Sequence, residues 1–209
     1  MNTVSFKENI KKFYNQEAEL RNSKYVKSDW KIKVRENFYN LTKHENKITL
    51  LEIGAGAGYD SQFFINNGLS VTAVDISSEM VKNCQEKGIE AYELDFYNLS
   101  RLNNKYDCIY AMNTLLHVPK ADLPHVLNEI NAVLDSSGLF YMGLYGGQDT
   151  EGEFIKIEVS DAPRFFAFHS KSYLKEVLER HFRIIDFETL DVDSHGNIDT
   201  FHSIIMRKQ

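Results

Sequence analysis

The chain has 209 residues, of which 43% are hydrophobic and 26% charged, a balance typical of one globular domain with a buried core. Its formal net charge of −6 disfavours binding to nucleic acid through bulk phosphate electrostatics. The two cysteines, Cys84 and Cys108, lack metal-site spacing, and we expect both to be reduced thiols. Without a signal-peptide core or an apolar run of membrane-spanning length, we expect a cytoplasmic protein that does not bind membranes.

The first part of the chain predicts two amphipathic helices, over residues 6–20 and 29–44. The apolar residues that share a helical face are Phe6, Ile10, Phe13 and Tyr14 in the first segment and Trp30, Val34, Phe38 and Leu41 in the second. The lysine-rich stretch KENIKK in the first segment is expected to be a solvated helix face. We therefore expect residues 1–46 to form an N-terminal helical cap.

From residue 48 the pattern alternates between short apolar runs and amphipathic segments. The expected strands are 48–54, 69–75, 89–95, 106–112 and 138–145, and the expected helices are 60–68, 77–88 and 121–134. Alternation of strands and helices at this spacing predicts right-handed crossovers and a parallel sheet.

The tail of the chain has a different character. Residues 146–169 show little periodicity and are expected to be an irregular connection, and a helix is expected over 170–181. Two alternating strands follow, at 182–192 and 199–208, joined across the turn-like stretch SHGN. This spacing predicts an antiparallel hairpin, which makes the sheet mixed at that edge.

The stretch LEIGAGAGYD, residues 51–60, carries an apolar strand directly into three glycines on alternate positions. Residues without side chains permit positive φ angles and allow a ligand to lie against backbone amides at a helix N-terminus. A dinucleotide fingerprint would read G-x-G-x-x-G, but its sixth position here is Tyr59. The match to a nicotinamide or flavin site is therefore poor.

The pattern Glu52-x-Gly54-x-Gly56-x-Gly58 resembles the first motif of the class I S-adenosylmethionine-dependent methyltransferases. The resemblance covers roughly residues 47–145, and it departs from the family where the usual Gly-Gly before the fifth strand is Ser137-Gly138. It implies an α/β, Rossmann-like, doubly wound fold with a mixed seven-stranded sheet, to which the C-terminal hairpin is similar. It also implies S-adenosylmethionine as the cofactor, with the glycine turn cradling its methionine half and Glu52 organising the turn.

The same resemblance implies roles for residues at the ends of the later strands. Asp75 ends the second strand, where a carboxylate can accept hydrogen bonds from both ribose hydroxyls. Asp95 ends the third strand and is expected to accept from the adenine amino group. The neighbours of these carboxylates, Ile76 and Phe96, are expected beside the adenine, and Asn113 near the amino-acid end. A single Asp at a strand end is more often a helix cap, but two behind a matching glycine turn favour a cofactor site.

Methyl transfer from a sulfonium is an in-line displacement, so positioning of the acceptor supplies most of the catalysis. A base is needed only when the acceptor must lose a proton. The sequence lacks the Asn/Asp-Pro-Pro-aromatic motif of amino-methyltransferases, a Pro-Cys nucleophile and a carboxylate cluster for magnesium. We therefore expect a metal-free enzyme that methylates oxygen or nitrogen of a small molecule, with no nucleic-acid partner; the acceptor's identity and the oligomeric state are not specified.

Candidate acceptor-side residues lie on three segments. His117 follows the fourth strand, where a neutral imidazole can take a proton from a hydroxyl or ammonium, although a hydrogen bond to a neighbouring turn is an equally simple role. Arg164 and Phe166, in the run PRFFAFH, would give an apolar pocket with one anion-binding group, or a strand packed on the core. Tyr14 would close over the site from the N-terminal helices, as Tyr25, Trp30 and Arg35 would unless they simply pack in the core.

We thus expect a single methyltransferase domain over residues 1–209. It comprises the cap, a cofactor-binding core at 47–145, an acceptor lid at 146–169 and a C-terminal helix and hairpin at 170–209. Two alternatives stay open: a protein that binds S-adenosylmethionine as a non-catalytic regulator, and an NAD-dependent oxidoreductase, which the missing third glycine disfavours.

Overall fold

The computed structural model describes residues 3–23, 28–155, 160, 162–194 and 197–209. Its α-helices are α1 (Thr3–Ser23), α2 (Asp29–His44), α3 (Tyr59–Asn66), α4 (Ser78–Glu86), α5 (Leu123–Val133) and α6 (Lys171–Leu178), with 3-10 turns η1 (Leu99–Leu102) and η2 (Leu115–His117). Its strands are β1 (Thr49–Ile53), β2 (Ser70–Asp75), β3 (Glu90–Glu93), β4 (Tyr106–Met112), β5 (Leu134–Gly146), β6 (Thr150–Phe154), β7 (Arg164–Phe168), β8 (Phe182–Ser194) and β9 (Asn197–Lys208). Within the described ranges, no helix is long and apolar enough to cross a membrane.

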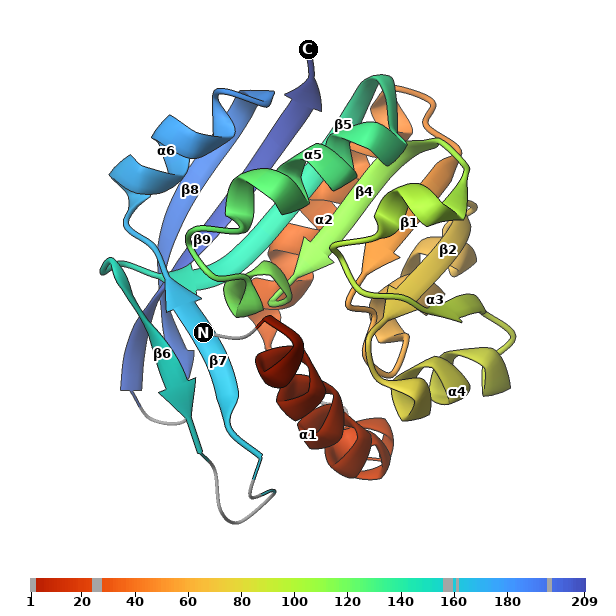
Figure 1. Cartoon of the computed structure of the whole chain (residues 1–209). Coiled ribbons are helices and arrows are strands. Elements are labelled where there is room, and N and C mark those ends of the chain that lie inside the picture. Colours follow the sequence, from red (N-terminus) through yellow and green to blue (C-terminus); the bar gives the residue numbers. More distant parts are fainter. Residues whose placement is uncertain (1–2, 24–27, 156–159, 161, 195–196) are drawn as a thin grey trace.

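The main sheet has seven strands in the order β3-β2-β1-β4-β5-β9-β8 (Figure 1). Strands β1 to β5 pair in parallel, and β9 runs antiparallel to both β5 and β8. The predicted mixed, doubly wound sheet with an antiparallel C-terminal hairpin is therefore confirmed. The two N-terminal helices are also present where the sequence predicts them.

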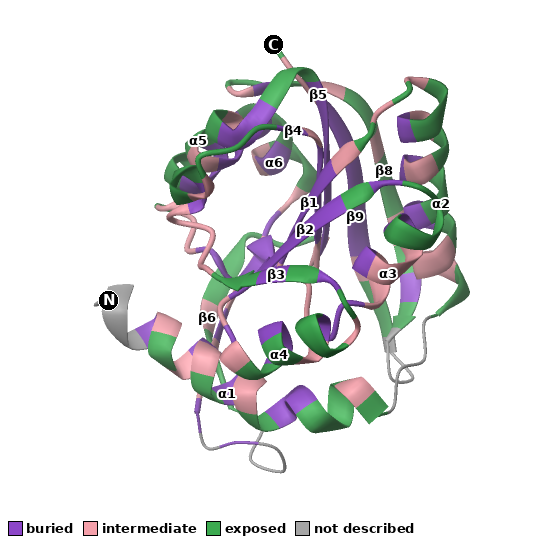
Figure 2. Ribbon diagram, turned by 90° about the vertical axis from the view of Figure 1, so that its right-hand side faces the viewer, coloured by how far each residue is buried: buried purple, intermediate pink, exposed green. Residues whose placement is uncertain are grey.

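Helices cover both faces of this sheet. On one face, Phe38 of α2 and Phe64 of α3 pack on β1, β4 and β5, and α4 packs beside them on β2 and β3. On the other face, α5 and α6 pack on the same central strands. Figure 2 shows the mostly buried sheet edge-on between α5 and α2, with α1 lying next to α4. Because both faces of the central strands are covered, their sequences are continuous apolar runs.

Several strand boundaries differ from the prediction, and at two of them the structure shows the reason. The third strand ends at Glu93, before the predicted end at Asp95, because the Asp95 carboxylate accepts from the Tyr97 amide at 2.9 Å and turns the chain. The fifth strand begins at Leu134, earlier than predicted, because Ser137, with φ of 58°, sits in a register shift inside the strand instead of in a turn before it.

The expectation of an irregular connection over 146–169 is wrong in part. Strands β6 and β7 form a separate two-stranded antiparallel sheet, which lies beside α1 in Figure 1. Phe165 and Ala167 face α1 and pack on Phe6 and Ile10. The alternating residues Phe166 and Phe168 are also aromatic, so the segment lacks the polar–apolar alternation that signals a strand.

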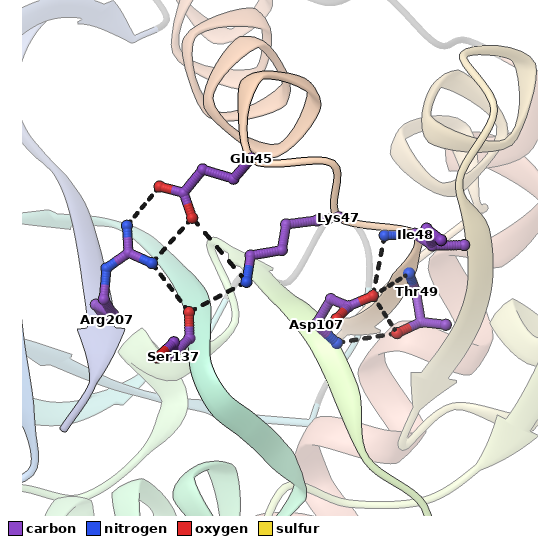
Figure 3. A network of polar contacts seen from close by, with 7 residues as sticks. All are labelled: Glu45, Lys47, Ile48, Thr49, Asp107, Ser137 and Arg207. Atoms are coloured by element: carbon purple, nitrogen blue, oxygen red, sulfur yellow. Dashed lines mark hydrogen bonds and ion pairs between the residues drawn. The ribbon is translucent and has the colours of Figure 1, made fainter.

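The amino ends of the central strands are tied together by polar contacts (Figure 3). The Arg207 guanidinium donates to both carboxylate oxygens of Glu45, at 2.5 and 2.9 Å, and to the Ser137 carbonyl at 3.0 Å. The Asp107 carboxylate accepts from the amides of Ile48 and Thr49 at 2.9 and 3.0 Å, and from the Thr49 hydroxyl at 3.1 Å. These contacts join the end of α2 to β1, β4, β5 and β9.

Candidate functional site

The glycine turn between β1 and α3 has three residues with positive φ: 71° at Gly54, 55° at Gly56 and 80° at Gly58. A Cβ atom on Gly54 would lie 1.6 Å from Thr114 Oγ1, and one on Gly58 would lie 2.7 Å from Ile89 Cδ1. A Cβ atom on Gly56 would meet no atom within 4 Å. The outer two glycines therefore permit close packing within the protein, whereas Gly56 faces open space.

That open space belongs to a cavity of about 350 Å³ beyond the carboxyl ends of the parallel strands. The predicted cofactor residues that line it are Glu52, Gly54, Gly56, Asp75, Ile76, Asp95, Phe96 and Asn113. Gly58 is the exception, because it is the N-cap of α3 and packs against Cys84. His117 and Tyr14 line the same cavity, while Arg164 and Phe166 are not part of its wall.

Two buried carboxylates organise the glycine turn. Glu52 in β1 accepts a hydrogen bond from the Ser61 hydroxyl of α3, which joins the strand to the helix after the turn. Asp75 accepts from the Gly56 amide and from the Ser77 amide, both at 2.9 Å. Burial raises the pKa of Asp75, and these backbone hydrogen bonds oppose that shift. Each carboxylate oxygen of Asp75 keeps a lone pair with which to accept from a ligand hydroxyl.

Asp95 makes an ion pair that the sequence does not predict. Its carboxylate accepts from Lys7 Nζ at 3.1 Å, and the Lys7 ammonium lies 3.7 Å from the centroid of the Tyr97 ring. Lys11 pairs in the same way with Glu93 at 2.5 Å. The expectation that the KENIKK stretch is a solvated face is therefore wrong for these two lysines, which dock α1 on the end of β3.

Asn113 follows β4 in a left-handed conformation, with φ of 54°. Its amide donates to the Gly143 carbonyl at 2.7 Å, which fixes the backbone against β5. Its side-chain oxygen is buried and has no hydrogen-bond partner among the described residues. Because a buried polar atom without a partner is unfavourable, this oxygen marks a position where a ligand would be expected to donate.

His117 is buried at the cavity wall and makes two hydrogen bonds. Nδ1 lies 2.7 Å from the Phe165 carbonyl oxygen, and Nε2 lies 2.8 Å from the Tyr14 hydroxyl. A carbonyl only accepts, so Nδ1 carries the proton and Nε2 of the neutral ring accepts from Tyr14. Burial lowers the pKa of His117 to about 4, which keeps the ring neutral at physiological pH. The Tyr14 hydroxyl therefore donates its proton to Nε2, and its oxygen lies near the positive charge of Arg164.

Arg164 and Phe166 lie on β7, behind His117. The Phe166 ring centroid lies 4.8 Å from that of His117, and the Arg164 guanidinium lies 4.0 Å from the Phe13 ring centroid. Arg164 Nε is buried without a hydrogen-bond partner among the described residues. Of the three residues predicted to bind an acceptor, only Tyr14 lines the cavity; the other two contact the residues around it.

Several residues of the cavity wall are not predicted from the sequence. The largest omissions are Arg21 of α1 and Lys31 of α2, which line the cavity together with Ile10, Met80 and Thr114. Helical periodicity identifies the apolar faces of α1 and α2, but it does not indicate that these faces extend over the ends of the strands. Of the other candidates in the N-terminal segment, Tyr25 lies outside the described residues, Trp30 packs on Phe201, and Arg35 pairs with Asp60.

Within the described ranges, no group of three or more His, Cys, Asp or Glu side chains is arranged to hold a metal ion. Cys84 and Cys108 are buried free thiols, and burial raises the pKa of Cys84 to about 12. Both cysteines are therefore protonated and contribute to packing.

Comparison with known proteins finds similarity to methyltransferases in the core of this chain. A family described as a methyltransferase domain matches residues 50–138. A malonyl-(acyl-carrier protein) O-methyltransferase from Hamiltonella defensa subsp. Acyrthosiphon pisum (strain 5AT) is 34% identical over 101 residues, which are 47% of this chain. The match spans only 38% of that relative's length.

Solved structures share the whole fold. The 1,6-didemethyltoxoflavin-N1-methyltransferase of Burkholderia thailandensis, with bound 1,6-didemethyltoxoflavin and S-adenosylhomocysteine, has a TM-score of 0.73 at 19% identity, covering 99% of this chain and 88% of that one. The cyclase SpnF has a TM-score of 0.71 at 14% identity, covering 98% of this chain and 96% of that one. The same fold thus carries different chemistries, and the choice between them has to come from the site.

Proposed function

We propose that this chain, whose residues 50–138 form a methyltransferase domain of the class I S-adenosylmethionine-dependent family, methylates an oxygen or nitrogen atom of a small-molecule acceptor. The family match over residues 50–138 and the shared fold support the resemblance predicted from Glu52 and the glycine turn, and with it S-adenosylmethionine as the proposed cofactor. The observation that carries the proposal is one cavity of about 350 Å³ that joins the glycine turn and strand-end carboxylates to the Tyr14–His117 pair.

The residues present fit the cofactor. Gly56 leaves the backbone open toward the cavity, and the Asn113 oxygen is buried and unpartnered within the described ranges. Asp75 would hold the ribose hydroxyls, Ile76 would flank the adenine, and Glu52 would keep the turn in shape. When bound, S-adenosylmethionine supplies an activated methyl group on a sulfonium, so the protein has mainly to position the acceptor and manage its proton.

The proton step falls to Tyr14 and His117. The Phe165 carbonyl holds the His117 proton on Nδ1, so that Nε2 accepts the Tyr14 hydroxyl proton. The Tyr14 oxygen would then accept a proton from an acceptor hydroxyl or ammonium while its own proton passes to Nε2. Burial raises the pKa of Tyr14, and the positive charge of the neighbouring Arg164 is among the causes that oppose this shift, because it favours an anion at this point.

The size and polarity of the cavity support a small-molecule acceptor. The Burkholderia enzyme with the same fold holds such an acceptor together with S-adenosylhomocysteine. Arg164 is proposed to act on an anionic acceptor through its position beside Tyr14. We retain the cytoplasm as the proposed location.

The first test of this function separates cofactor classes. S-adenosylhomocysteine should raise the melting temperature of the purified protein, and NAD should leave it unchanged. A stabilisation by NAD instead would favour the oxidoreductase alternative.

The second test separates an enzyme from a regulator. A radiolabelled methyl-transfer screen over small-molecule extracts should yield a labelled product that Tyr14→Phe and His117→Gln both reduce. Binding of S-adenosylhomocysteine with no labelled product in any extract would favour the non-catalytic regulator. For an anionic acceptor, Arg164→Ala should lower turnover far more than cofactor affinity.

A further inference from the structure

Two basic side chains from the N-terminal helices line the cavity wall, and the function proposed above assigns neither of them. Arg21 lies near the end of α1, and Lys31 lies in the first turn of α2. The Arg21 guanidinium carbon lies 5.1 Å from the Tyr14 ring centroid, and Arg21 Nε donates to Glu17 at 2.5 Å. Both cations therefore lie on the helical side of the cavity, where Tyr14 also contributes to the wall.

The acidic groups of the cavity already have partners of their own. Asp60 pairs with Arg35 at 2.9 Å, Asp95 pairs with Lys7, and Asp75 accepts from backbone amides. By contrast, no hydrogen bond or ion pair joins the Lys31 ammonium to any residue in the described part of the chain. Lys31 is thus a partly buried cation in the cavity wall without a counter-charge in contact.

The electrostatic surroundings of Lys31 indicate what kind of anion would fit. Burial lowers the pKa of Lys31, the nearby Asp60 carboxylate opposes that shift, and the positive charge of Arg21 adds to it. A bound anion would therefore relieve both the desolvation of the ammonium and its repulsion by Arg21. Because Asp60 is close, a singly charged group is favoured over a dianionic phosphate.

We propose that Lys31, with Arg21 beside it, binds a carboxylate group in this cavity. The inference rests on the proposed methyltransferase function, since that function brings two carboxylate sources to the cavity. One source is the amino-acid end of the cofactor, and the other is a carboxylate on the acceptor. Both sources offer a carboxylate to Lys31. Two nucleosides, one with and one without the amino-acid end, distinguish the cofactor from the acceptor as the source.

The first arm compares S-adenosylhomocysteine with 5′-methylthioadenosine, which shares the nucleoside and thioether sulfur and lacks the amino-acid end. Calorimetry should show that Lys31→Met weakens binding of S-adenosylhomocysteine about tenfold or more and leaves 5′-methylthioadenosine within about twofold. Lys31→Arg, which restores the charge, should recover most of the loss. This pattern assigns the site to the cofactor's carboxylate.

The second arm tests the acceptor as the source. Benzoate, an aromatic carboxylate, is titrated into protein saturated with S-adenosylhomocysteine. If Lys31→Met leaves both nucleosides unaffected and abolishes benzoate binding, the carboxylate comes from the acceptor. If the variant changes neither nucleoside binding nor benzoate binding, the proposal is overturned.

Two controls keep these outcomes separate from other failures. Lys33→Met removes an exposed lysine from the same helix and should change none of the three affinities, and unfolding curves confirm that each variant is folded. A wild-type protein that binds neither nucleoside would overturn the proposed function. The benzoate titration of the free protein then decides the carboxylate site by itself.

Discussion

The two ends of the sheet use polar side chains in opposite ways. At the amino end, Asp107 accepts three hydrogen bonds, and both terminal nitrogens of the Arg207 guanidinium donate to the Glu45 carboxylate (Figure 3). At the carboxyl end, the Asn113 oxygen is buried without a partner among the described residues, and Gly56 faces open space.

The same contrast appears in the pKa values. The hydrogen bonds from Arg207 lower the pKa of Glu45, whereas burial raises the pKa of Asp75. Polar groups whose hydrogen bonds are all made within the protein stabilise the fold by themselves. Buried polar groups that lack a hydrogen-bond partner are stabilised only when a ligand supplies that partner. Substitutions at the carboxyl end should therefore act mainly on ligand binding, and those at the amino end mainly on unfolding.

The largest effect is expected at Gly56. Gly56→Val places a side chain in the space that the cofactor needs and should weaken binding of S-adenosylhomocysteine about 100-fold or more. The matched control is Gly88→Val, since Gly88 also has a positive φ, 76°, and its added Cβ also meets no atom within 4 Å. Both variants should lose about 1–2 kcal/mol of stability from backbone strain. Calorimetry that finds normal binding in Gly56→Val would make the turn purely structural.

The next effect is expected at Asp75. Asp75→Ala removes the acceptor for two ligand hydroxyls and should weaken cofactor binding by about 2–3 kcal/mol. It also leaves the amides of Gly56 and Ser77 without an acceptor, so the free energy of unfolding must be measured together with the affinity for the cofactor. Asp95→Ala should cost less, because Lys7 already engages that carboxylate. An affinity within about twofold of wild type would remove Asp75 from the site.

A pH effect is expected from His117. Its pKa falls to about 4 on burial, so below the unfolded value of about 6.5 the unfolded chain binds more protons than the folded one. Its contribution to stability is therefore complete above the unfolded pKa and is lost as pH falls toward the folded pKa. Denaturant unfolding should lose about 2 kcal/mol from this residue between pH 7.5 and 5. His117→Gln should show a correspondingly flatter profile; parallel profiles would mean that the ring is solvated.

The amino end should respond in stability alone. Asp107→Ala leaves the donors of Ile48 and Thr49 without an acceptor and should lower the free energy of unfolding by about 1–2 kcal/mol, with S-adenosylhomocysteine affinity unchanged. Burial favours a higher pKa for Asp107, but hydrogen bonds from Thr49 and Ile48 outweigh it, so the net pKa is lowered. The contribution is thus present above about pH 3.9 and is lost below it. A loss of ligand affinity in this variant would break the contrast between the two ends.

Local sequence patterns predict the parallel core well, and they do so for a physical reason. Each strand and the helix that follows it are close in sequence, so apolar periodicity predicts the elements and glycine residues predict where they end. The rule that ligands bind beyond the carboxyl ends of parallel strands then brings Asp75 and Asp95 to one cavity without knowledge of their contacts.

What the sequence misses depends on pairs of residues that are distant in the chain. The contact of Lys7 with Asp95 joins α1 to the end of β3, and nothing in the periodicity of α1 signals it. Lys31 and Arg21 have the appearance of solvated helix residues until α1 and α2 are placed over the strand ends. The β6–β7 sheet is missed because aromatic side chains occupy both of its faces.

The smallest effect is expected in hydrogen exchange. The extent to which bound ligand slows exchange should decrease from the carboxyl end of the sheet to the amino end. Bound S-adenosylhomocysteine should slow exchange in residues 10–40 and 146–169, the two segments expected to enclose the acceptor. The structure predicts which of the two segments should respond more strongly. Tyr14 of α1 lines the cavity directly, so α1 should respond more strongly. Strand β7 is not part of the cavity wall and contacts it through wall residues such as His117, whose ring donates to the Phe165 carbonyl, so its response should be weaker.

The remaining regions provide the internal reference for this measurement. No described residue of the β8–β9 hairpin or of the network around Asp107 lines the cavity, so both regions should exchange equally with and without ligand. Tyr14→Phe should weaken the response of β7, because it removes the hydroxyl that joins α1 to His117, while α1 stays protected. Identical exchange of both segments in the presence and absence of ligand would disprove the enclosure. The aromatic run of β7 would then be core packing, and the acceptor would have to reach the methyl group by another side of the cavity.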